Sequence, residues 1–341
     1  MDCRAAFANL DAVKETLVLG VVRIAMATRA TTRGRHTKRT AAFVKACVAF
    51  CFITTPSIDT PLLRVRLHLL TACAALANAL LPQMDASFKA AVTIVTEMQG
   101  LAANESPPLT TTQAEAAAKE EALVSILSSA CSLLIAVPGH PDHGPFHMAT
   151  GLLNIFHSCH WRRPASLPTL HLRMLSVFNA YAQPTLPYRA PGVDANDVLY
   201  AAEAGYHESL DAVASKLLET LLGDLAALKE RTDGASQRVQ ARRLPSGVPC
   251  PARAAWRAMR ARAQASIALQ LADLIAATTS LTPPLAGLCC KLLGLALRSD
   301  AVDKAHARNV GACVARLAAE RPKSHAELWA KAAPLFDAIG R

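Results

Sequence analysis

Helix-breaking residues recur along this chain at fairly regular intervals, and this spacing constrains the fold more than any other feature. Proline lacks the backbone N–H that a helix needs, and glycine loses more conformational freedom than other residues when a helix forms. The segments between the breakers are about 15–25 residues long and have helical periodicity. The breakers are Gly34, Pro56 with Pro61, Pro82, the segments 100–110, 138–145, 164–168, 184–192 and 231–251, Pro283 with Pro284, and Pro322.

Apolar stripes run along several of these segments. Leucine follows the i, i+3, i+7, i+10 spacing of one helix face in 285–297, and similar stripes occur in 166–181 and 213–228. Core packing explains all three stripes. The members of these stripes are Leu285, Leu288, Leu292 and Leu295; Leu167, Leu170, Met174, Phe178 and Tyr181; and Val213, Leu217, Leu221, Leu225 and Leu228.

Two local signals refine this description. The segment 40–54 is apolar nearly all round, so we expect it to be covered on both sides. Asp59 and Thr60 precede Pro61, which is a good combination for the start of a helix.

The composition favours helices over strands. Hydrophobic residues make up 52% of the 341 positions but aromatic residues only 5%, and few runs alternate apolar with polar residues. A bundle of roughly ten to twelve helices would need one thick core, whereas a stack of helix pairs needs only neighbour contacts. The breaker spacing fits pairs of about 40 residues. The predicted fold is an all-α, HEAT-like α-solenoid of antiparallel helix pairs over 1–341, with sub-blocks 1–100, 112–230 and 251–341.

The number of cysteines and the length of the apolar runs indicate the cellular compartment in which the protein resides. Ten cysteines are too few for a disulfide scaffold, and most of them sit in apolar helical runs, which predicts a reducing cytosol. The N-terminus has no signal-peptide pattern. The most apolar stretch, 46–53, is shorter than the about 20 residues that span a bilayer.

Catalytic motifs are absent from the sequence. It contains no glycine-rich phosphate loop, no G-x-S-x-G elbow, no H-E-x-x-H motif and no carboxylate pair in an obvious cleft. We therefore predict a protein that is not an enzyme, with no catalytic residues, no cofactor and no metal.

The stretch 137-VPGHPDHGPFHMATGLLNIFHSCHW-161 holds five of the eleven histidines and allows two interpretations. In the first, His140, His143 and His147 converge on a zinc ion, and His157, Cys159 or His160 supplies a fourth ligand. In the second, which we favour, the stretch is a turn before a helix. The distal candidates then lie about 20 Å from the helix start and cannot share an ion with His140.

The basic residues leave a further alternative open. The formal net charge is +10, and basic clusters occur at 29–39, 240–243 and 252–262. In the last cluster, Arg253, Arg257 and Arg260 share one helical face, beside Trp256. The alternative function is a basic helical-repeat protein that binds nucleic acid. Because no recognition module or set of stacking aromatics accompanies the clusters, we expect a solvated face or an acidic protein partner, and no nucleic acid.

Several blocks of the sequence resemble, in order and spacing, the C-terminal part of the vacuolar protein sorting-associated protein 35-like family, the large subunits of the retriever complex. None of these blocks is a catalytic motif, and beyond about residue 230 only the helix pattern is similar. The blocks are 7-FANLDAVKETLVLGVVRIAMATR-29, 37-TKRTAAFVKACVAFCFITTPS-57, 76-LANALLPQMDASFKAAVTIV-95, 137–161, 169-TLHLRMLSVFNAYAQPTLPY-188 and 196-NDVLY-200.

The resemblance implies an α-solenoid scaffold without enzymatic activity. In the family, the C-terminal solenoid cradles a small subunit with a metallophosphoesterase fold that is shared with retromer. The N-terminal half binds an arrestin-like subunit. The complex joins coiled-coil-containing, commander-type partners on endosomes and returns cargo to the cell surface, with a sorting nexin as adaptor. The expected location is the cytoplasm, peripherally on endosomes.

From the resemblance we expect the N-terminal half of the family protein to be absent, as in a fragment, a truncated gene model or a reduced homologue. This puts binding of the arrestin-like subunit in question, but not binding of the phosphoesterase-like subunit.

A surface for a partner is predicted on the 138–147 turn and the helix that follows it. The turn is stiffened by proline and carries several imidazoles, so it would lose little entropy on docking. A helix corner without a partner remains the alternative. The candidate interface residues are His140, Pro141, His143, Phe146, His147 and Tyr188.

Overall fold

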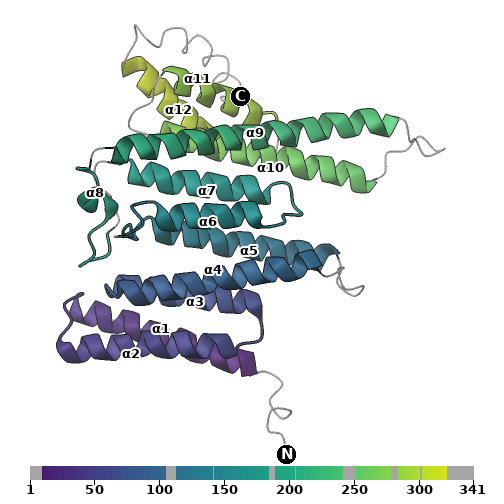
Figure 1. Cartoon of the computed structure of the whole chain (residues 1–341). Helices are drawn as coiled ribbons and strands as arrows, with labels where there is room; N and C mark the ends of the chain where they lie inside the picture. Colours follow the sequence, from purple (N-terminus) through teal and green to yellow (C-terminus); the bar gives the residue numbers. More distant parts are fainter. Residues whose placement is uncertain are drawn as a thin grey trace, which may run out of the picture. The chain divides into compact units, whose positions relative to one another are not determined.

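The computed structural model describes residues 10–104, 113–140, 142–183, 189–203, 205–240, 251–277, 283–299 and 302–320. These residues form twelve α-helices and one 3-10 helix, with no strand beyond an isolated bridge between His140 and Gly144 (Figure 1). The prediction of an all-α fold is confirmed.

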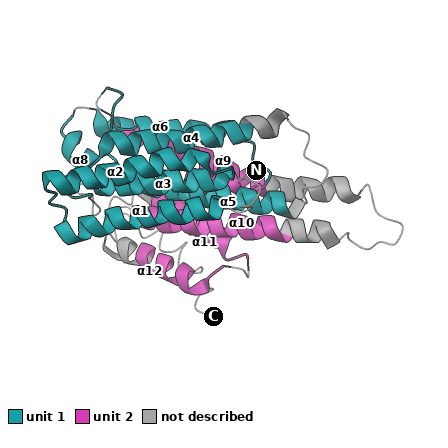
Figure 2. Cartoon of the chain, turned by 90° about the horizontal axis from the view of Figure 1, so that it is seen from below, with its two compact units in different colours: residues 1–162, 180–209 teal, residues 163–179, 210–341 magenta. Residues whose placement is uncertain are grey.

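The chain divides into two compact units, which Figure 2 colours teal and magenta. Unit 1 comprises residues 1–162 and 180–209, and unit 2 comprises residues 163–179 and 210–341. The division falls within two helices, α7 (Ser166–Tyr181) and α9 (Tyr206–Gln240). The three sub-blocks expected from the linkers remain a prediction.

Among the described residues of unit 1, the main helix–helix contacts join helices that are near neighbours in the sequence. The contacts join α1 with α2 and α3, α2 with α3 and α4, α3 with α4 and α5, and α6 with α4 and α5. This is the contact pattern of an α-solenoid. The helices are α1 (Leu10–Thr32), α2 (Lys38–Thr54), the 3-10 helix η2 (Thr55–Ser57), α3 (Pro61–Ala77), α4 (Leu81–Asn104), α5 (Gln113–Leu134), α6 (His147–Ser158) and the short α8 (Asn196–Leu199).

The helix pairs of unit 1 are longer than the sequence predicted. The first helices of three successive pairs begin at Leu10, Pro61 and Gln113. The repeat is therefore about 50 residues and not the about 40 residues expected from breaker spacing. The reason is that α1, α4 and α5 each extend for more than 20 residues.

The starts of α2 and α3 in unit 1 differ in how they are capped. Thr37 closes a capping box at the start of α2, where its hydroxyl accepts from the Thr40 N–H at 3.3 Å and its own N–H donates to the Thr40 hydroxyl at 2.8 Å. The start of α3 at Pro61 is as predicted, but the Thr60 side chain makes no cap hydrogen bond to the helix.

Asp11 of α1 instead holds the two residues that precede α3. Its carboxylate accepts the backbone N–H groups of Asp59 and Thr60 at 3.1–3.2 Å, together with the Thr60 hydroxyl at 3.1 Å. The hydrogen bond from the Asp59 backbone is the main reason why the pKa of Asp11 lies below its usual value. A contact that a different helix supplies leaves no local sequence signal.

The first helix pair packs on one side and exposes apolar residues on the other. Val18 of α1, Cys51 of α2, and Ile58 and Leu67 form one buried cluster. The prediction that 40–54 is covered on both sides is wrong in this structure, because Ile53 is 74% exposed. The other large apolar residues exposed on these two helices are Leu10, Val13, Leu17, Ile24, Met26, Phe43, Phe50 and Phe52.

The apolar segment that contains 46–53 is longer than the sequence analysis assumed, because it extends over residues 38–57. Among the described residues, this one segment of 20 residues is long and apolar enough to cross a membrane, whereas the sequence argument measured only 46–53. Length and composition are the only grounds for that assignment. A core helix of a helical repeat passes the same test, and α2 packs against α1 and α3.

The eight cysteines among the described residues are free thiols, and six of them are buried. Burial raises the pKa of Cys51 to about 11 and that of Cys289 to about 12. These thiols therefore behave as small apolar groups, as predicted. Cys73 is exposed at the surface and Cys313 is only partly buried.

Unit 2 contains α10 (Pro251–Ala276), α11 (Pro283–Ala296) and α12 (Lys304–Glu320), which all contact one another. The stripes predicted in 166–181 and 213–228 lie on buried faces, with Phe178 and Leu221 fully buried. The face of α11 differs from the prediction. Its centre lies on the buried Ala286, Cys289 and Leu293, whereas Leu285, Leu288 and Leu295 are only partly buried. Small residues on this face allow α10 to approach closely.

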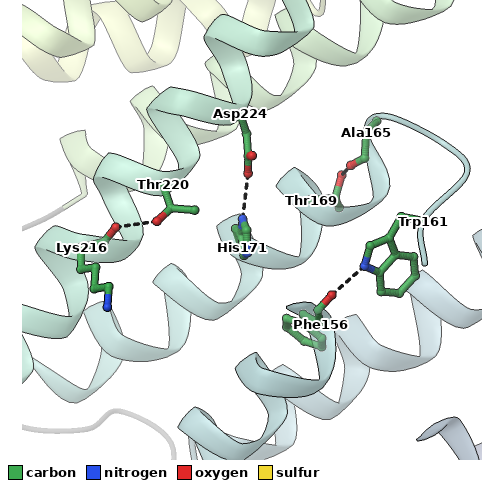
Figure 3. Close-up of polar contacts among 8 residues, drawn as sticks. All are labelled: Phe156, Trp161, Ala165, Thr169, His171, Lys216, Thr220 and Asp224. Carbon is green, nitrogen blue, oxygen red and sulfur yellow. Dashed lines mark hydrogen bonds and ion pairs between the residues drawn. The ribbon is translucent and has the colours of Figure 1, made fainter. Parts of the chain in front are cut away.

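A buried polar contact joins α7 to α9 in unit 2. His171 Nδ1 lies 2.8 Å from a carboxylate oxygen of Asp224, and the His171 side chain is 1% exposed (Figure 3). A buried imidazole without a partner would cost free energy, so this contact fixes the register of the two helices.

We expect Asp224→Ala to lower the free energy of unfolding by about 2 kcal/mol, because it removes the charged partner of a buried ring. Urea unfolding followed by circular dichroism measures this loss. Asp211→Ala, at an exposed position of α9, is the matched control and should change stability little. Equal effects of the two substitutions would contradict a stabilising role for the contact.

His68 of α3 predicts a pH dependence of stability. Burial, reinforced by the positive charge of Arg64, lowers the pKa of His68 to about 4. The unfolded chain, with a histidine pKa of about 6.5, therefore takes up a proton before the folded chain does. The free energy of unfolding should fall as the pH drops from about 6.5 to about 4, by up to about 3 kcal/mol.

Chemical unfolding at a series of pH values, compared between the parent and His68→Leu, isolates this contribution. The leucine variant should lose the His68 part of the slope because it has no titrating group at this position. An identical slope in both proteins would show that His68 does not carry the effect.

Candidate functional site

The predicted partner surface is a closed turn between α5 and α6. The His140 N–H donates to the Gly144 carbonyl at 3.1 Å, and the Gly144 N–H donates to the His140 carbonyl at 2.9 Å. Gly144 has a φ of +85°, a conformation that glycine adopts without strain. Residues 137–140 and 142–147 therefore belong to a hydrogen-bonded turn, which we call the histidine turn.

The region of α8 holds the histidine turn in place from outside. The Asn196 side chain accepts the Gly139 N–H at 2.6 Å and donates to the Pro145 carbonyl at 3.3 Å. The Tyr200 hydroxyl donates to the His140 carbonyl at 3.4 Å. Asn196 is 1% exposed, so these bonds form away from water. Two blocks quoted for the family resemblance, 137–161 and 196–200, thus meet in space.

Aromatic stacking fixes the end of the histidine turn. The Phe146 ring stacks on the rings of Tyr206 and Tyr181, with centroid distances of 5.4 Å and 6.2 Å. Burial raises the pKa of Tyr206 to about 12, with a further contribution from Asp197. The Tyr181 hydroxyl donates to the Leu134 carbonyl at 2.7 Å, and burial also raises its pKa. Phe146 therefore anchors the turn as part of a stack and is half-buried.

Three imidazoles gather on the outside of the turn. The ring centroids of His140 and His143 lie 4.5 Å apart, those of His143 and His147 lie 4.5 Å apart, and those of His140 and His147 lie 5.7 Å apart. His143 and His147 are exposed. The three histidines that the sequence considered together do come together.

Most of the charges around His147 lower the pKa of its imidazole. Burial lowers its pKa, and the positive charges of His143, His140 and Lys89 lower it further. The carboxylate of Asp85 opposes them. A lowered pKa keeps His147 neutral over more of the physiological range.

The arrangement of these rings does not form a metal site. Among the described residues, no group of three or more His, Cys, Asp or Glu side chains is placed to hold an ion. His140 and His143 stack with an angle of 29° between their rings, and His140 Nδ1 accepts the Asp142 N–H at 3.1 Å. Stacked rings do not direct their nitrogens toward one ion.

The proposed fourth ligands lie at the far end of α6. Burial raises the pKa of Cys159 to about 11, which disfavours the thiolate that a metal needs. The backbone N–H of His160 donates to the Gln99 side chain at 3.2 Å, and the Trp161 indole donates to the Phe156 carbonyl at 2.8 Å (Figure 3). This end of α6 is thus occupied by structural hydrogen bonds.

Two of the six candidate interface residues, Pro141 and Tyr188, lie outside the described residues. Sequence reasoning missed the residues that support the turn, Gly139, Asn196, Tyr200 and Tyr206. Asn196 and Tyr200 stand in the block 196–200, so their positions were noted without a role. Their role depends on contacts over more than fifty residues, which no local pattern reports.

The fold and the histidine turn alone indicate the class of protein, which is a helical-repeat protein with an ordered, exposed turn. Among the described residues there is no constellation of catalytic side chains. The family model described as "VPS35L C-terminal domain" matches residues 1–334. The chain belongs to this family, so the predicted resemblance is confirmed.

Relatives from three distantly related organisms are also similar to this chain in sequence. The "VPS35 endosomal protein sorting factor-like" protein of Dictyostelium discoideum is 34% identical over 239 residues, which cover 70% of this chain and 23% of the relative. The corresponding protein of Homo sapiens is 34% identical over 226 residues (66% and 22%), and that of Drosophila melanogaster is 30% identical over 231 residues (67% and 23%). The matched part thus spans less than a quarter of the length of these relatives.

Gly139→Ala tests how closely the histidine turn is packed. An added Cβ would lie 2.5 Å from the Pro145 Cα and 2.8 Å from the Tyr200 ring, so the turn would have to shift. We expect the free energy of unfolding to fall by about 2 kcal/mol.

Gly151→Ala is the matched control. Gly151 lies in α6, and nothing is within 4 Å of a Cβ added there. This variant should be neutral or more stable, by up to about 1 kcal/mol, because alanine favours a helix. Thermal and urea unfolding measure both changes. A Gly139→Ala protein as stable as the parent would contradict the packing described for the turn.

Proposed function

We propose that the chain is a non-enzymatic scaffold subunit of a retriever-type endosomal complex that returns cargo from endosomes to the plasma membrane. Within that complex it binds the small subunit of metallophosphoesterase fold. The observation that carries the proposal is the family match over residues 1–334. The relatives that match carry names that refer to endosomal protein sorting.

The structure supports a role in binding a folded partner. Among the described residues of unit 1, the main contacts join neighbouring helices, and the surface of such a helical repeat suits a compact protein. The histidine turn is held by hydrogen bonds and an aromatic stack, so little conformational entropy is lost when it docks. The rings of His143 and His147 are exposed, so a partner can contact both of them. A stable complex should bury about 1,000 Å² or more in total.

Further parts of the proposal follow from the family. The partners would include coiled-coil-containing, commander-type proteins, and the chain would associate peripherally with endosomes from the cytoplasm. We do not extend the proposal to an arrestin-like subunit. The nucleic-acid alternative has no support, since the matching relatives are named as sorting factors.

The test is a pull-down with the purified metallophosphoesterase-fold subunit. The parent chain should retain this subunit in a stoichiometric complex. His143→Ala combined with His147→Ala should weaken binding about tenfold or more, because both rings would leave the interface.

His157→Ala combined with His160→Ala is the matched control, since both residues are exposed at the other end of α6. This variant should bind like the parent. A folded parent chain that fails to retain the subunit would refute the proposed function. Parent-like binding by the His143 and His147 variant would exclude the histidine turn from the interface.

A further inference from the structure

The first helix pair carries most of the large apolar residues that are exposed in the described part of the chain. Nine of the twelve such residues lie on α1 and α2. Seven of the nine form one stripe on each helix, with the i, i+3, i+7, i+14 spacing on α1 and the i, i+7, i+10 spacing on α2. We call these seven side chains the apolar face, and they are Leu10, Val13, Leu17, Ile24, Phe43, Phe50 and Ile53.

The two helices use other residues for packing within unit 1. Val18 and Cys51 pack with Leu67 of α3 in one buried cluster, and Ala25 and Val44 belong to a second. Figure 1 shows α1 and α2 side by side, next to α3. Each of the two helices therefore has one apolar stripe that packs within the unit and a second that is exposed.

Basic residues accompany the apolar face. Residues 10–57 contain eight lysines and arginines but only two acidic residues, whereas residues 58–104, which contain the next helix pair, hold three of each. The Asp11 carboxylate accepts hydrogen bonds from the residues before α3. The positive charge is thus concentrated on the same helix pair that exposes apolar residues. Six of the eight basic side chains are exposed, namely Arg23, Arg33, Arg35, Lys38, Arg39 and Lys45.

The helical spacing places cationic groups at the border of the apolar face. Arg39 precedes Phe43 by one turn of α2 on the same side of the helix. Lys38 and Lys45 are two turns apart, so they lie in one row along α2, beside the stripe. A ligand that covers the apolar face therefore meets positive charge at its edge.

This combination decides between the surfaces that could cover the apolar face. A second copy of the chain would bring two strongly basic helix pairs together, and like charges repel. A further helix pair of the repeat needs apolar contacts alone, as the balanced charge of 58–104 illustrates. An anionic bilayer uses both features, because its acyl chains accept phenylalanine and aliphatic side chains while its headgroups attract lysine and arginine.

We propose that the apolar face of α1 and α2 docks on the surface of a bilayer that contains anionic phospholipids. The two helices lie along the bilayer surface, and α2 does not span it, because Val44, Cys47 and Cys51 are buried within unit 1. This inference rests on the proposed peripheral association with endosomes and names the surface and the lipid class that would mediate it.

Flotation of the full chain with vesicles tests the proposal. The probe is a phosphatidylcholine vesicle that contains about 30% phosphatidylserine, a model of an anionic cytoplasmic leaflet. The parent chain should float with these vesicles. Binding to vesicles of phosphatidylcholine alone should be at least about tenfold weaker, because the attraction to anionic headgroups is lost.

Two variants separate the apolar contribution from the charge. Phe50→Ser with Ile53→Ser keeps every charge and should weaken binding to the anionic vesicles at least about tenfold. Lys38→Glu with Lys45→Glu keeps the apolar face and should also weaken binding at least about tenfold. All four positions are exposed, so the helices should remain intact, which circular dichroism checks.

Each variant has a matched control elsewhere in the chain. Val198→Ser with Leu199→Ser removes two other exposed apolar residues, and Lys216→Glu with Lys291→Glu reverses two other exposed charges. Both controls should bind vesicles like the parent. The proposal is overturned if either control weakens binding as much as its counterpart does, or if the Phe50 and Ile53 variant binds like the parent.

Two further results identify a different role for the apolar face. If the chain does not float with the anionic vesicles but forms a dimer that the Phe50 and Ile53 variant abolishes in analytical ultracentrifugation, the face binds a second copy and the proposal is wrong. A parent chain that retains the metallophosphoesterase-fold subunit but does not float overturns this inference alone. The Phe50 and Ile53 variant should still retain that subunit, so loss of vesicle binding is distinguishable from loss of the proposed function.

Discussion

The burial of one apolar stripe per helix against its neighbours in sequence is the constraint on which the rest of the structure depends. Val18 of α1, Cys51 of α2 and Leu67 of α3 form one buried cluster, and its described members all come from α1, α2, α3 and the residues that join them. Since each helix satisfies its apolar face locally, unit 1 does not require one thick core. The same rule leaves apolar residues of α1 and α2, such as Val13 and Ile53, exposed on the side without a neighbour.

Polar and aromatic contacts hold the segments that are not held by the packing of apolar helix faces. The histidine turn has no apolar stripe, and Asn196 and the ring of Phe146 hold it instead. In unit 2, His171 and Asp224 join two helices inside the packed region. Buried polar groups are costly without partners, so each such contact allows one arrangement and disfavours the others. The histidine turn, which we assign to a partner surface, is held by such contacts.

The features of the fold that depend on local sequence patterns, namely the helices and their buried faces, could be predicted from the sequence. Proline positions and apolar periodicity indicated the helices, and the stripe from Leu217 to Leu228 lies on a buried face as expected. It did not predict the contact of Asp11 with the residues before α3 or the bond from Gly139 to Asn196, since both join residues that are about fifty positions apart. The face of α11 was misplaced because large leucines were weighted over Cys289, whose size allows close packing.

The central claim is that an ordered turn on a helical-repeat scaffold binds a folded partner and performs no reaction. Amide hydrogen exchange of the turn, measured with and without the metallophosphoesterase-fold subunit, tests this claim most directly. The amides of Gly139, His140 and Gly144, which donate within the structure, should exchange slowly in the free chain and more slowly in the complex. Fast exchange in the free chain, or no change when the subunit is present, would contradict the account.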